Sequence, residues 1–430
     1  MAERRVLYVC HNHPSIRPGG VETYALELYE GMREHPRWAP ILLARSGPPY
    51  APRRSSDDSG RISGVDGDPN QYLLHTGLDD WNWLLGAFHD KTILTEGLRQ
   101  FLLDHRPDVV HFHHTLFIGY DAIRLVRNVL PQTRIVYTLH EFLPICHRGG
   151  QLLRTGTDEP CLEESPRRCH ECFPDIPPDE FFLRKRWIQS QLALVDRFIA
   201  PSRFLLERYV DWGIPRTKLC FEDYGRRTQA HPAPPRATSR PTHIGFFGQL
   251  SPHKGVNVLL AAMQKLSRAG AQARLWMHGT NLDLQSDGFQ REFHALLADA
   301  GEAVTPAGAY GADELPSLMA NVDWVVVPSL WWENSPLVIQ EAFLHGRPVI
   351  CSDIGGMAEK VADGVSGLHF RAGDPESLAR VLARAVDSQE LWRSLRAGIP
   401  NVHAMDAHVR TLSGMYEELL EHDRARRAAA

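Results

Sequence analysis

Short apolar runs alternate with helical patterns along most of the chain. In the first half, the runs that predict strands are residues 6–10, 41–44, 109–112, 135–138 and 198–201. Between some of them the apolar residues recur with helical spacing, as in 22–33 and 92–104. Strands that are apolar throughout are buried on both faces, which is typical of a parallel sheet covered by helices. The first half therefore predicts a doubly wound α/β domain.

The same pattern restarts in the second half. Residues 226–241 are rich in Pro, Arg, Thr and Ala and have no periodicity, so they predict a linker. After it, strands are expected at 244–247, 275–278, 324–327 and 349–351. We place one domain at 1–232 and a second at 242–402, with a final amphipathic helix within 403–430. The polar stretch 48–69 predicts a mobile surface loop.

Composition and charge narrow the class of protein. The chain has 430 residues and a net charge of -5, which argues against nucleic acid as a partner. We find no apolar stretch long enough to span a bilayer, and the run at 6–10 is too short for a signal peptide. We therefore expect a cytoplasmic protein, with peripheral contact at the inner face of a membrane left open.

Residues 327–370 are the most informative stretch. A predicted strand ends at Pro328, and a helix is expected to begin near Ser335 or Pro336, because Ser is a good N-cap and Pro is favoured in a first helical turn. The start of a helix offers free backbone N–H groups and partial positive charge, which suit a diphosphate. This stretch therefore predicts a phosphate site.

Two glutamates and a glycine pair accompany this helix. Glu333 lies just before it, where a carboxylate can reach a sugar hydroxyl, and Glu341 lies inside it, where a carboxylate can accept hydrogen bonds from a ribose diol. Gly355 and Gly356 allow the backbone to approach a ligand closely. The simpler alternative is an ordinary surface helix after a strand.

This ordered stretch, with two Glu, then Gly-Arg-Pro-Val-Ile, then Ile-Gly-Gly, resembles the signature of glycosyltransferase family 4. The resemblance implies a GT-B fold, in which two Rossmann-like domains face each other across a cleft. It implies a retaining transfer from a UDP- or GDP-sugar to a glycan, a lipid-linked molecule or a small molecule, as in polysaccharide biosynthesis, without a catalytic divalent metal. The first domain would bind the acceptor and the second the nucleotide sugar, and the final helix would cross back to the first domain.

The resemblance also assigns roles to residues. Glu333 would orient the sugar, Glu341 would hold the ribose and Lys254 would bind the diphosphate. The backbone donors and the walls of the sugar pocket would be Asn334, Ser335, Pro336, Leu337, Gly355, Gly356 and Met357. Family members usually carry an Arg where this chain has Gln249, which donates hydrogen bonds but has no charge. Another Arg would then substitute, or Lys254 would act with the helix start alone.

Two further matches lie in the first domain. Gly19 and Gly20 open the first helix, and the resemblance places their loop near the donor phosphate and the acceptor. His140 follows the strand 135–138, where sites in open α/β sheets gather, and similar enzymes have a histidine here that contacts the sugar. The alternatives are a flexible turn for the glycines and a structural histidine bonded to backbone for His140.

A cysteine-rich insertion at 144–176 predicts a metal site. It contains Cys146, Cys161, Cys169 and Cys172, and the last two form a Cys-x-x-Cys motif. Four thiolates with this spacing suit a structural, tetrahedral zinc ion, which would stabilise a segment with little hydrophobic core. Unrelated free thiols are the alternative.

Two other functions fit the same residues. One is an enzyme such as a nucleotide-sugar epimerase on the same double-Rossmann plan. The other is a non-catalytic protein that binds a nucleotide sugar, which the replacement of Arg by Gln249 favours.

Overall fold

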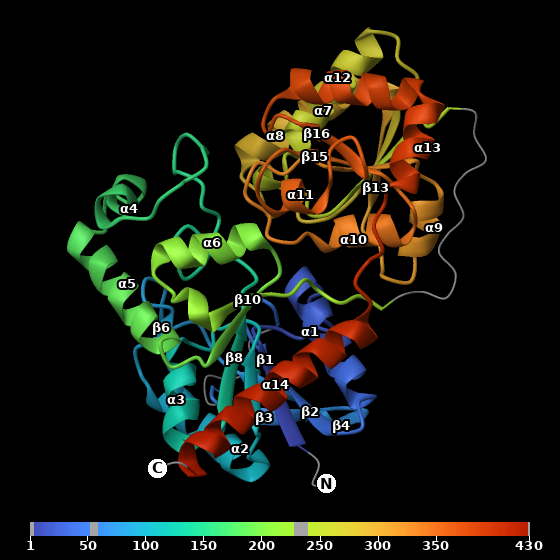
Figure 1. The fold of residues 1–430 in the computed structure, drawn as a ribbon. Helices are drawn as coiled ribbons and strands as arrows, with labels where there is room; N and C mark the ends of the chain where they lie inside the picture. The colour runs from blue at the N-terminus through green and yellow to red at the C-terminus, as the bar shows by residue number, and fades with distance from the viewer. Residues whose placement is uncertain (1–3, 52–58, 228–239, 429–430) are drawn as a thin grey trace. The chain divides into compact units, whose positions relative to one another are not determined.

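The computed structural model describes residues 4–51, 59–227 and 240–428. The chain divides into two compact units, which we treat separately (Figure 1). Unit 1 comprises Met1–Arg227 and His403–Ala430, and unit 2 comprises Thr228–Val402.

Unit 1 is built on an eight-stranded sheet with the order β10-β9-β8-β7-β1-β2-β4-β3. Within the described residues its neighbouring strands are parallel, except for the antiparallel pair β3 and β4. The strands are β1 (Arg4–Cys10), β2 (Trp38–Ser46), β3 (Ile62–Val65), β4 (Asp68–His75), β7 (Val109–Phe112), β8 (Arg134–Thr138), β9 (Arg197–Ala200) and β10 (Leu219–Phe221). Two short strands, β5 (Trp81–Asn82) and β6 (Ala87–Phe88), pair separately.

The helices of unit 1 connect these strands. They are α1 (Gly20–Arg33), α2 (Thr92–His105), α3 (Asp121–Val129), α4 (Pro166–Cys172), α5 (Pro178–Leu192), α6 (Arg203–Trp212), the 3-10 helix η2 (Arg216–Lys218) and the final helix α14 (Met405–Ala428). Local chemistry sets their ends. In α6, for example, the Ser202 side chain accepts a hydrogen bond from the backbone N–H of Leu205, and Gly213 ends the helix with φ of 112°.

Unit 2 has a six-stranded parallel sheet with the order β13-β12-β11-β14-β15-β16. Its strands are β11 (His243–Phe247), β12 (Arg274–His278), β13 (Val304–Gly308), β14 (Trp324–Val327), β15 (Val349–Ser352) and β16 (Gly367–Phe370). Its helices are η3 (Pro252–Lys254), α7 (Val256–Arg268), α8 (Asp287–Ala300), η4 (Gly301–Ala303), α9 (Leu315–Ala320), α10 (Leu337–Leu344), α11 (Gly355–Lys360), α12 (Pro375–Asp387) and α13 (Gln389–Ala397).

Both faces of this second sheet are covered, as its continuous apolar strands predicted. Along β14, Trp324 and Val326 belong to one hydrophobic cluster, while Val325 and Val327 belong to another. Successive residues of a strand point to opposite faces, so the two clusters lie on the two sides of the sheet. The predicted fold class, α/β with doubly wound sheets, is confirmed.

One prediction about unit 1 is partly wrong. The stretch 48–69 was expected to be a surface loop, but Ile62–Val65 forms β3, and β4 begins at Asp68 and pairs in parallel with β2. The sequence of β3 resembles a loop because β3 is the edge strand of the sheet and is not fully buried. Residues 52–58 of that stretch, and 228–239 of the expected linker, lie outside the described residues.

The final helix belongs to unit 1, where it packs against α1 and the sheet. Trp38 of β2 donates its indole N–H to the Ser413 hydroxyl of α14 at 2.9 Å, and Tyr416 lies 2.6 Å from His111 Nδ1. Among the described helices, none combines the length and the apolar character that crossing a membrane would require.

Candidate functional site

The strand order of unit 2 reverses between β11 and β14, which are neighbours although β12 and β13 separate them in the sequence. Loops that follow such a pair turn to opposite faces and leave a crevice at the carboxyl ends of the strands, where open α/β sheets bind ligands. The loop after β11 carries Gln249 and Lys254, and the loop after β14 carries residues 328–336. The two loops singled out from the sequence therefore meet at this reversal.

Lys254 and Glu333 are in direct contact there. The Lys254 Nζ atom lies 2.5 Å from Glu333 Oε1. The same carboxylate oxygen accepts hydrogen bonds from the Ser329 hydroxyl at 2.7 Å and from the Trp331 indole N–H at 2.9 Å. Lys254 also lies over the Trp331 ring, 5.5 Å from its centroid. The structure thus fixes one ammonium and one carboxylate side by side.

The ionisation of Glu333 follows from these contacts. The side chain is buried, and burial acts to raise its pKa. The charge and the hydrogen bond of Lys254, helped by Ser329 and Trp331, outweigh burial and hold the pKa of Glu333 below its ordinary value. The carboxylate is therefore ionised at neutral pH and already oriented.

Two glycines let the backbones around this pair approach closely. Gly255 has φ of +68°, and a Cβ atom there would lie 1.8 Å from the carbonyl oxygen of Pro328. A Cβ on Gly356 would lie 1.5 Å from the carbonyl oxygen of Asn334, and the Gly356 N–H donates to the Glu333 carbonyl at 2.8 Å. Any larger residue would force the backbone apart. The glycines thus hold both loops and the start of α11 together.

The helix of this site begins slightly later than predicted. Helix α10 starts at Leu337, Pro336 precedes its first turn, and no side chain caps it. The expectation that Ser335 acts as the N-cap is therefore wrong. Because Pro has no N–H and a fixed φ, it can lead directly into the helix without a capping side chain. Residues 334–336 are buried against the rest of unit 2.

Glu341, inside α10, lies near a group of aromatic rings. Phe247 and His278 stack with centroids 4.8 Å apart, and Tyr310 stands edge-on to Phe247 at 5.6 Å. Burial, and then the charge of Glu341, raise the pKa of Tyr310. A carboxylate beside flat rings can accept hydrogen bonds from a diol while the rings cover a planar base.

Two other residues that were predicted to bind the sugar donor, Gln249 and Met357, lie in contrasting surroundings. Gln249 is exposed, so its amide is accessible but brings no charge. Met357 is fully buried in a hydrophobic cluster with Cys351 and Val361, so its side chain is part of the core of unit 2.

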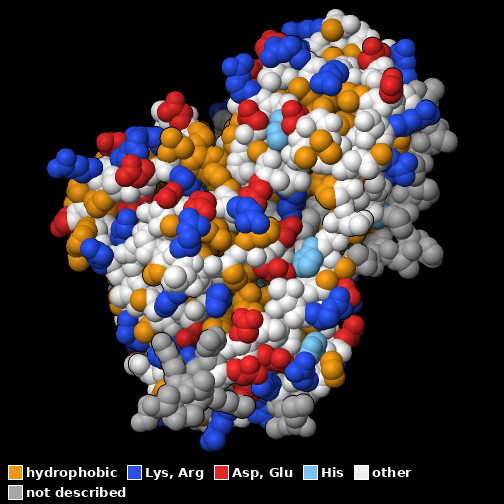
Figure 2. All heavy atoms as spheres, viewed as in Figure 1, with side chains coloured by type: hydrophobic (Ala, Val, Ile, Leu, Met, Phe, Trp, Pro, Cys, Tyr) orange, Lys and Arg blue, Asp and Glu red, His pale blue; other side chains and the backbone are white. Residues whose placement is uncertain are grey.

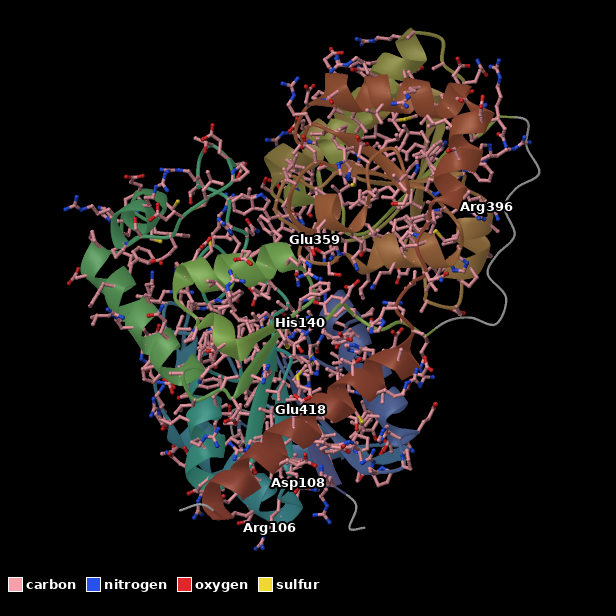
Figure 3. The ribbon with its side chains drawn as sticks, viewed as in Figure 1. Arg106, Asp108, His140, Glu359, Arg396 and Glu418 are labelled. Atoms are coloured by element: carbon pink, nitrogen blue, oxygen red, sulfur yellow. The ribbon has the colours of Figure 1, made fainter. Side chains whose placement is uncertain are left out.

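In unit 1 the strand order reverses between β1 and β7, and histidines gather at that edge of the sheet. His11 follows β1, His113 and His114 follow β7, and His140, labelled in Figure 3, follows β8. These positions are the carboxyl ends of neighbouring parallel strands, so the side chains meet.

A row of four titratable side chains connects these strand ends. Glu22 Oε1 lies 3.0 Å from His11 Nε2, the rings of His11 and His114 are 4.2 Å apart, and His114 Nε2 lies 3.4 Å from Glu141 Oε1. Burial acts to lower the pKa of His11, but the Glu22 carboxylate raises it well above its usual value. Burial and the charge of His11 lower the pKa of His114. The row therefore holds one imidazolium beside a neutral imidazole.

Glu141 is the carboxyl group of this row whose pKa is raised. Burial raises its pKa to about 8, although the backbone N–H of Leu143 and the charges of His11 and Arg184 oppose the shift. The carboxyl group therefore keeps its proton over much of the neutral range. A protonated carboxyl group beside a neutral imidazole can exchange a proton with a bound hydroxyl group.

The predicted glycine pair opens α1, with Gly19 before the helix and Gly20 as its first residue. The Oε2 atom of Glu22 lies only 2.5 Å from where a Cβ of Gly19 would stand. The glycine therefore leaves room for the Glu22 carboxylate at the positive start of the helix. A donor phosphate bound at this position would have to displace Glu22.

His140 is held by side chains on both ring nitrogens. Its Nδ1 lies 2.6 Å from the Tyr224 hydroxyl, and its Nε2 lies 3.2 Å from His113 Nδ1. Burial, followed by the charges of neighbouring histidines, lowers the pKa of His140 well below its usual value. The imidazole is therefore neutral and oriented, and a hydroxyl group could bond to it only by displacing the Tyr224 hydroxyl or the His113 ring.

Sequence patterns alone did not predict a role for His11, Glu22, His114 or Glu141. A usable signal was present, since His11 directly follows one apolar strand, His114 lies two residues after another, and Glu141 is the next residue after His140. The parallel order of β1, β7 and β8 was needed to show that they converge.

The four cysteines of the insertion lie in one region of unit 1. Cys169 and Cys172 belong to α4, and Cys161 lies next to the bridge between Leu153 and Pro160. Burial, and then the charges of Glu164 and Cys146, raise the pKa of Cys169 to about 12. Among the described residues, however, three donor atoms come within 4.8 Å of one another only in a group of Glu and His side chains elsewhere in unit 1.

Two family descriptions match the chain. Residues 18–221 match Glycosyltransferase Family 4, and residues 241–388 match Glycosyl transferases group 1. Among curated relatives, the chain is 27% identical over 206 residues to a lipopolysaccharide 1,2-N-acetylglucosaminetransferase of Salmonella typhimurium, covering 45% of this chain and 54% of the relative. It is 31% identical over 179 residues to a D-inositol 3-phosphate glycosyltransferase of Salinispora arenicola, covering 40% of each. The chain thus spans about half of these relatives or less.

A third relative and two solved structures extend over most of the chain. A glycogen synthase of Mycobacterium tuberculosis is 25% identical over 404 residues, covering 89% of this chain and 86% of the relative. The Anabaena protein HepE, solved in complex with UDP and glucose, is 15% identical with a TM-score of 0.66, covering 97% of this chain and 100% of that one. A sucrose-phosphate synthase from Thermosynechococcus elongatus is 17% identical with a TM-score of 0.70 and the same coverage. The fold is GT-B.

Proposed function

Because the chain belongs to glycosyltransferase family 4, we propose that it transfers a sugar from a nucleotide diphosphate sugar to an acceptor hydroxyl. One observation carries the proposal: the contact between Lys254 and Glu333 at the strand reversal of unit 2, beside the start of α10. The ammonium and the free N–H groups of the helix start would bind the diphosphate, and the carboxylate would orient the sugar.

The nucleoside would lie along α10. Glu341 would accept hydrogen bonds from the ribose hydroxyls, and the group of Phe247, His278 and Tyr310 would cover the base. HepE was solved with UDP and glucose, which supports UDP-sugars as the first donors to test, ahead of GDP-sugars.

We propose that the reaction retains the configuration of the sugar, as the family resemblance implies. The bond between the anomeric carbon and the diphosphate oxygen breaks, and the acceptor oxygen bonds to that carbon on the same face. The acceptor's proton passes to the departing diphosphate. Lys254 would stabilise the negative charge that develops on the leaving group, and this stabilisation is the protein's main contribution.

The acceptor would bind at the histidine-rich edge of unit 1, where protonated Glu141 can form hydrogen bonds to hydroxyl groups and neutral His140 would line the site. The relatives named above act on lipopolysaccharide, inositol phosphate and glycogen, which supports a glycan, a lipid-linked molecule or a small polyol as the acceptor class.

The test compares donor turnover in matched lysine variants. Lys254→Ala is expected to lower the rate of sugar transfer by about 100- to 1000-fold, because a charge that stabilises the transition state is lost. The control Lys265→Ala removes an exposed lysine of α7 that pairs with Glu376 in the same unit, and it should leave transfer unchanged. Equal activity of the two variants on a panel of UDP- and GDP-sugars would refute the proposal.

A non-catalytic nucleotide-sugar-binding protein is the second candidate, because Gln249 is exposed and uncharged where a second cation is expected. An epimerase-like enzyme is a third. Calorimetric donor binding without turnover across an acceptor panel would favour the binding protein. Conversion of the donor in the absence of any acceptor would favour the epimerase.

We also propose that Cys146, Cys161, Cys169 and Cys172 bind a structural zinc ion. Their common location, and the effect of Cys146 and Cys161 on the pKa of Cys169, support the proposal. The four sulfur atoms would have to draw together to bind the ion. Purified protein should contain about one zinc per chain and melt at a lower temperature in chelator. Less than about half an equivalent, with unchanged melting, would contradict it.

Peripheral membrane contact would suit a lipid-linked acceptor, and we place it on α4 and α5. Figure 2 shows hydrophobic, basic and acidic side chains interspersed over this part of unit 1. Phe182 and Leu183 are 49% and 59% exposed, and Arg186 stacks on Phe182. Co-sedimentation with anionic vesicles should be lost in Phe182→Ser/Leu183→Ser. Unchanged co-sedimentation would exclude this surface.

A further inference from the structure

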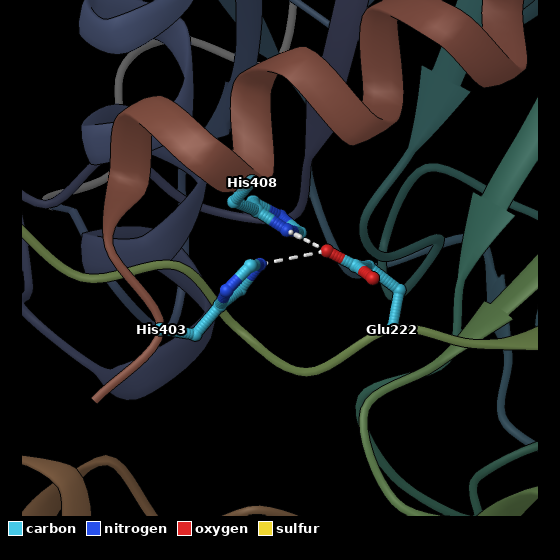
Figure 4. Close-up of side chains that lie close together, drawn as sticks. All are labelled: Glu222, His403 and His408. Atoms are coloured by element: carbon cyan, nitrogen blue, oxygen red, sulfur yellow. Dashed lines mark hydrogen bonds and ion pairs between the residues drawn. The ribbon is translucent and has the colours of Figure 1, made fainter. Parts of the chain in front are cut away.

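A second polar cluster lies where the chain leaves unit 1 and returns to it. Glu222 follows β10 directly, shortly before unit 1 ends at Arg227. His403 is the first residue of the returning segment, and His408 lies in the first turn of α14. Figure 4 shows these three side chains converging from the two segments. None of them has a part in the proposed transfer.

The three side chains share one oxygen atom. Glu222 Oε1 lies 2.8 Å from His403 Nε2 and 2.8 Å from His408 Nδ1. One donor atom from each residue lies within 4.8 Å of the other two. Two imidazole nitrogens and one carboxylate oxygen form a donor set that suits divalent transition metals, zinc above all.

The backbone holds the cluster in place. The Arg226 N–H donates to the His403 carbonyl at 2.9 Å, and the Met405 N–H donates to the Arg226 carbonyl at 2.9 Å. A Cβ on Gly225 would lie 2.5 Å from the Cβ of His408, so the two segments touch at a glycine. The donor atoms are therefore positioned by main-chain pairing before any ion binds.

His408 also has the outer partner that a metal-bound histidine needs. Its Nε2 lies 2.7 Å from the Tyr24 hydroxyl of α1. A hydroxyl group can donate or accept, so it can hold the tautomer in which Nε2 carries the proton and Nδ1 is free to bind a metal. The side chains of His408, Glu222 and His403 are 0%, 16% and 31% exposed, which leaves one open side for entry and for a water ligand.

We propose that Glu222, His403 and His408 form a binding site for a divalent transition metal of the zinc class. The ion would bond to Glu222, His403 Nε2 and His408 Nδ1 and would release the proton from each imidazole nitrogen that it binds. Because its ligands come from the leaving and the returning segment, the ion would tie together the two connections to unit 2. The site is separate from the predicted cysteine site in donor type and in position.

The test measures metal binding by the full chain. Cys161→Ser/Cys169→Ser serves as the background, so that thiolates do not compete. After removal of metal by chelator, this protein should bind about one equivalent of Zn²⁺ in equilibrium dialysis. Adding His403→Gln, which keeps a hydrogen-bond donor near Glu222 and alters a partly exposed side chain, should weaken binding by about 100-fold or more.

A matched control and a spectrum complete the test. His105→Gln alters a partly buried histidine at the end of α2, and it should bind zinc as the background does. Co²⁺ bound at the site should show visible d–d bands without the thiolate charge-transfer absorption that a cysteine site would give. Uptake below about half an equivalent, or equal binding by His403→Gln and His105→Gln, would overturn the proposal and identify the cluster as a hydrogen-bond network only.

Discussion

The two units place their polar residues at the same topological position but use different chemistry there. In unit 2, two loops at the reversal of strand order bring Lys254 against Glu333, whose lowered pKa keeps the carboxylate ionised throughout the neutral range. In unit 1, the corresponding edge of the sheet gathers three side chains with displaced pKa values: the pKa is raised for His11 and Glu141 and lowered for His114. The comparison shows that strand order sets where polar residues gather in each unit, while the identity of the side chains sets their charge and pH dependence.

The difference has a structural origin. The unit 2 pair is held by glycines whose neighbours are backbone atoms, so its geometry tolerates little change. The unit 1 row is held by side chains against side chains, and at Gly19 the close neighbour is the end of the Glu22 side chain. We therefore expect unit 2 to respond mainly to steric changes and unit 1 mainly to pH.

The largest expected effect is steric and falls on unit 2. Gly255→Ala places a methyl group 1.8 Å from the Pro328 carbonyl oxygen at a φ of +68°. We expect it to lower the unfolding free energy of unit 2 by roughly 3–5 kcal/mol, since overpacking adds to the strain of a left-handed residue. Differential scanning calorimetry would show the loss in the transition of that unit.

A second glycine distinguishes the free-energy cost of a steric clash from the cost of backbone strain at a positive φ. Gly270 has φ of +77° but open space around its Cβ position, so Gly270→Ala should cost only about 1–2 kcal/mol. If both variants lose the same free energy, close backbone approach does not explain Gly255, and the proposed contrast between the units weakens.

The next effect concerns pH in unit 1. The pKa of Glu141 is about 8 in the folded chain against 4.5 for the unperturbed group. Between these values the unfolded carboxyl group loses its proton while the folded one keeps it, so stability falls as pH rises from about 5 to 8. Glu141→Gln should remove this loss. In denaturant titrations, the slope of the unfolding free energy against pH should change by up to about 1.4 kcal/mol per pH unit.

The Lys254–Glu333 pair provides the contrast. The pKa of Glu333 in the folded chain lies below 4.5. Its contribution to the free energy of unfolding is therefore complete above that pH and is lost only in more acidic solution. Glu333→Gln should therefore leave the slope between pH 5 and 8 unchanged. If the slopes of wild type and Glu141→Gln coincide, Glu141 is not the source of the pH dependence expected of unit 1.

A smaller effect tests how α14 is attached to unit 1. Tyr416→Phe removes the hydroxyl that lies 2.6 Å from His111 Nδ1, and both residues are fully buried. We expect a loss of about 1–2 kcal/mol, measured by urea denaturation, because a buried nitrogen loses its partner. Tyr72→Phe, in a half-buried ring of β4, serves as the control and should cost less. Equal losses would mean that the hydroxyl contributes nothing specific.

The smallest expected effect tests whether unit 2 lacks a second cation for binding the donor diphosphate. Gln249→Arg adds the cation that the family resemblance implies, on an exposed residue of the loop after β11. We expect donor affinity to rise by up to about 10-fold in isothermal titration calorimetry, because the hydrogen bond to the phosphate becomes charge-assisted. Unchanged affinity would indicate that another group already supplies this charge.

Much of the fold and part of the site could be predicted from local sequence. The apolar runs identified both sheets, since a strand buried on two faces has no polar positions. Strand β3 was missed because an edge strand needs few apolar residues, and Ser335 does not cap α10 because Pro336 leads into the helix without a capping side chain. The cysteine ligands and the donor roles stay predictions.

The sequence by itself determined the parallel α/β architecture, the two glycine-bearing loops of unit 2 and the residue types that suit a diphosphate, because periodicity and turn chemistry act over short stretches. Only the tertiary structure decided that Glu22, His11, His114 and Glu141 form one row, and that Glu222 meets two histidines of the final segment. Such contacts depend on strand order and on where a returning helix packs. No local pattern encodes either, because both are set by the burial of the whole core.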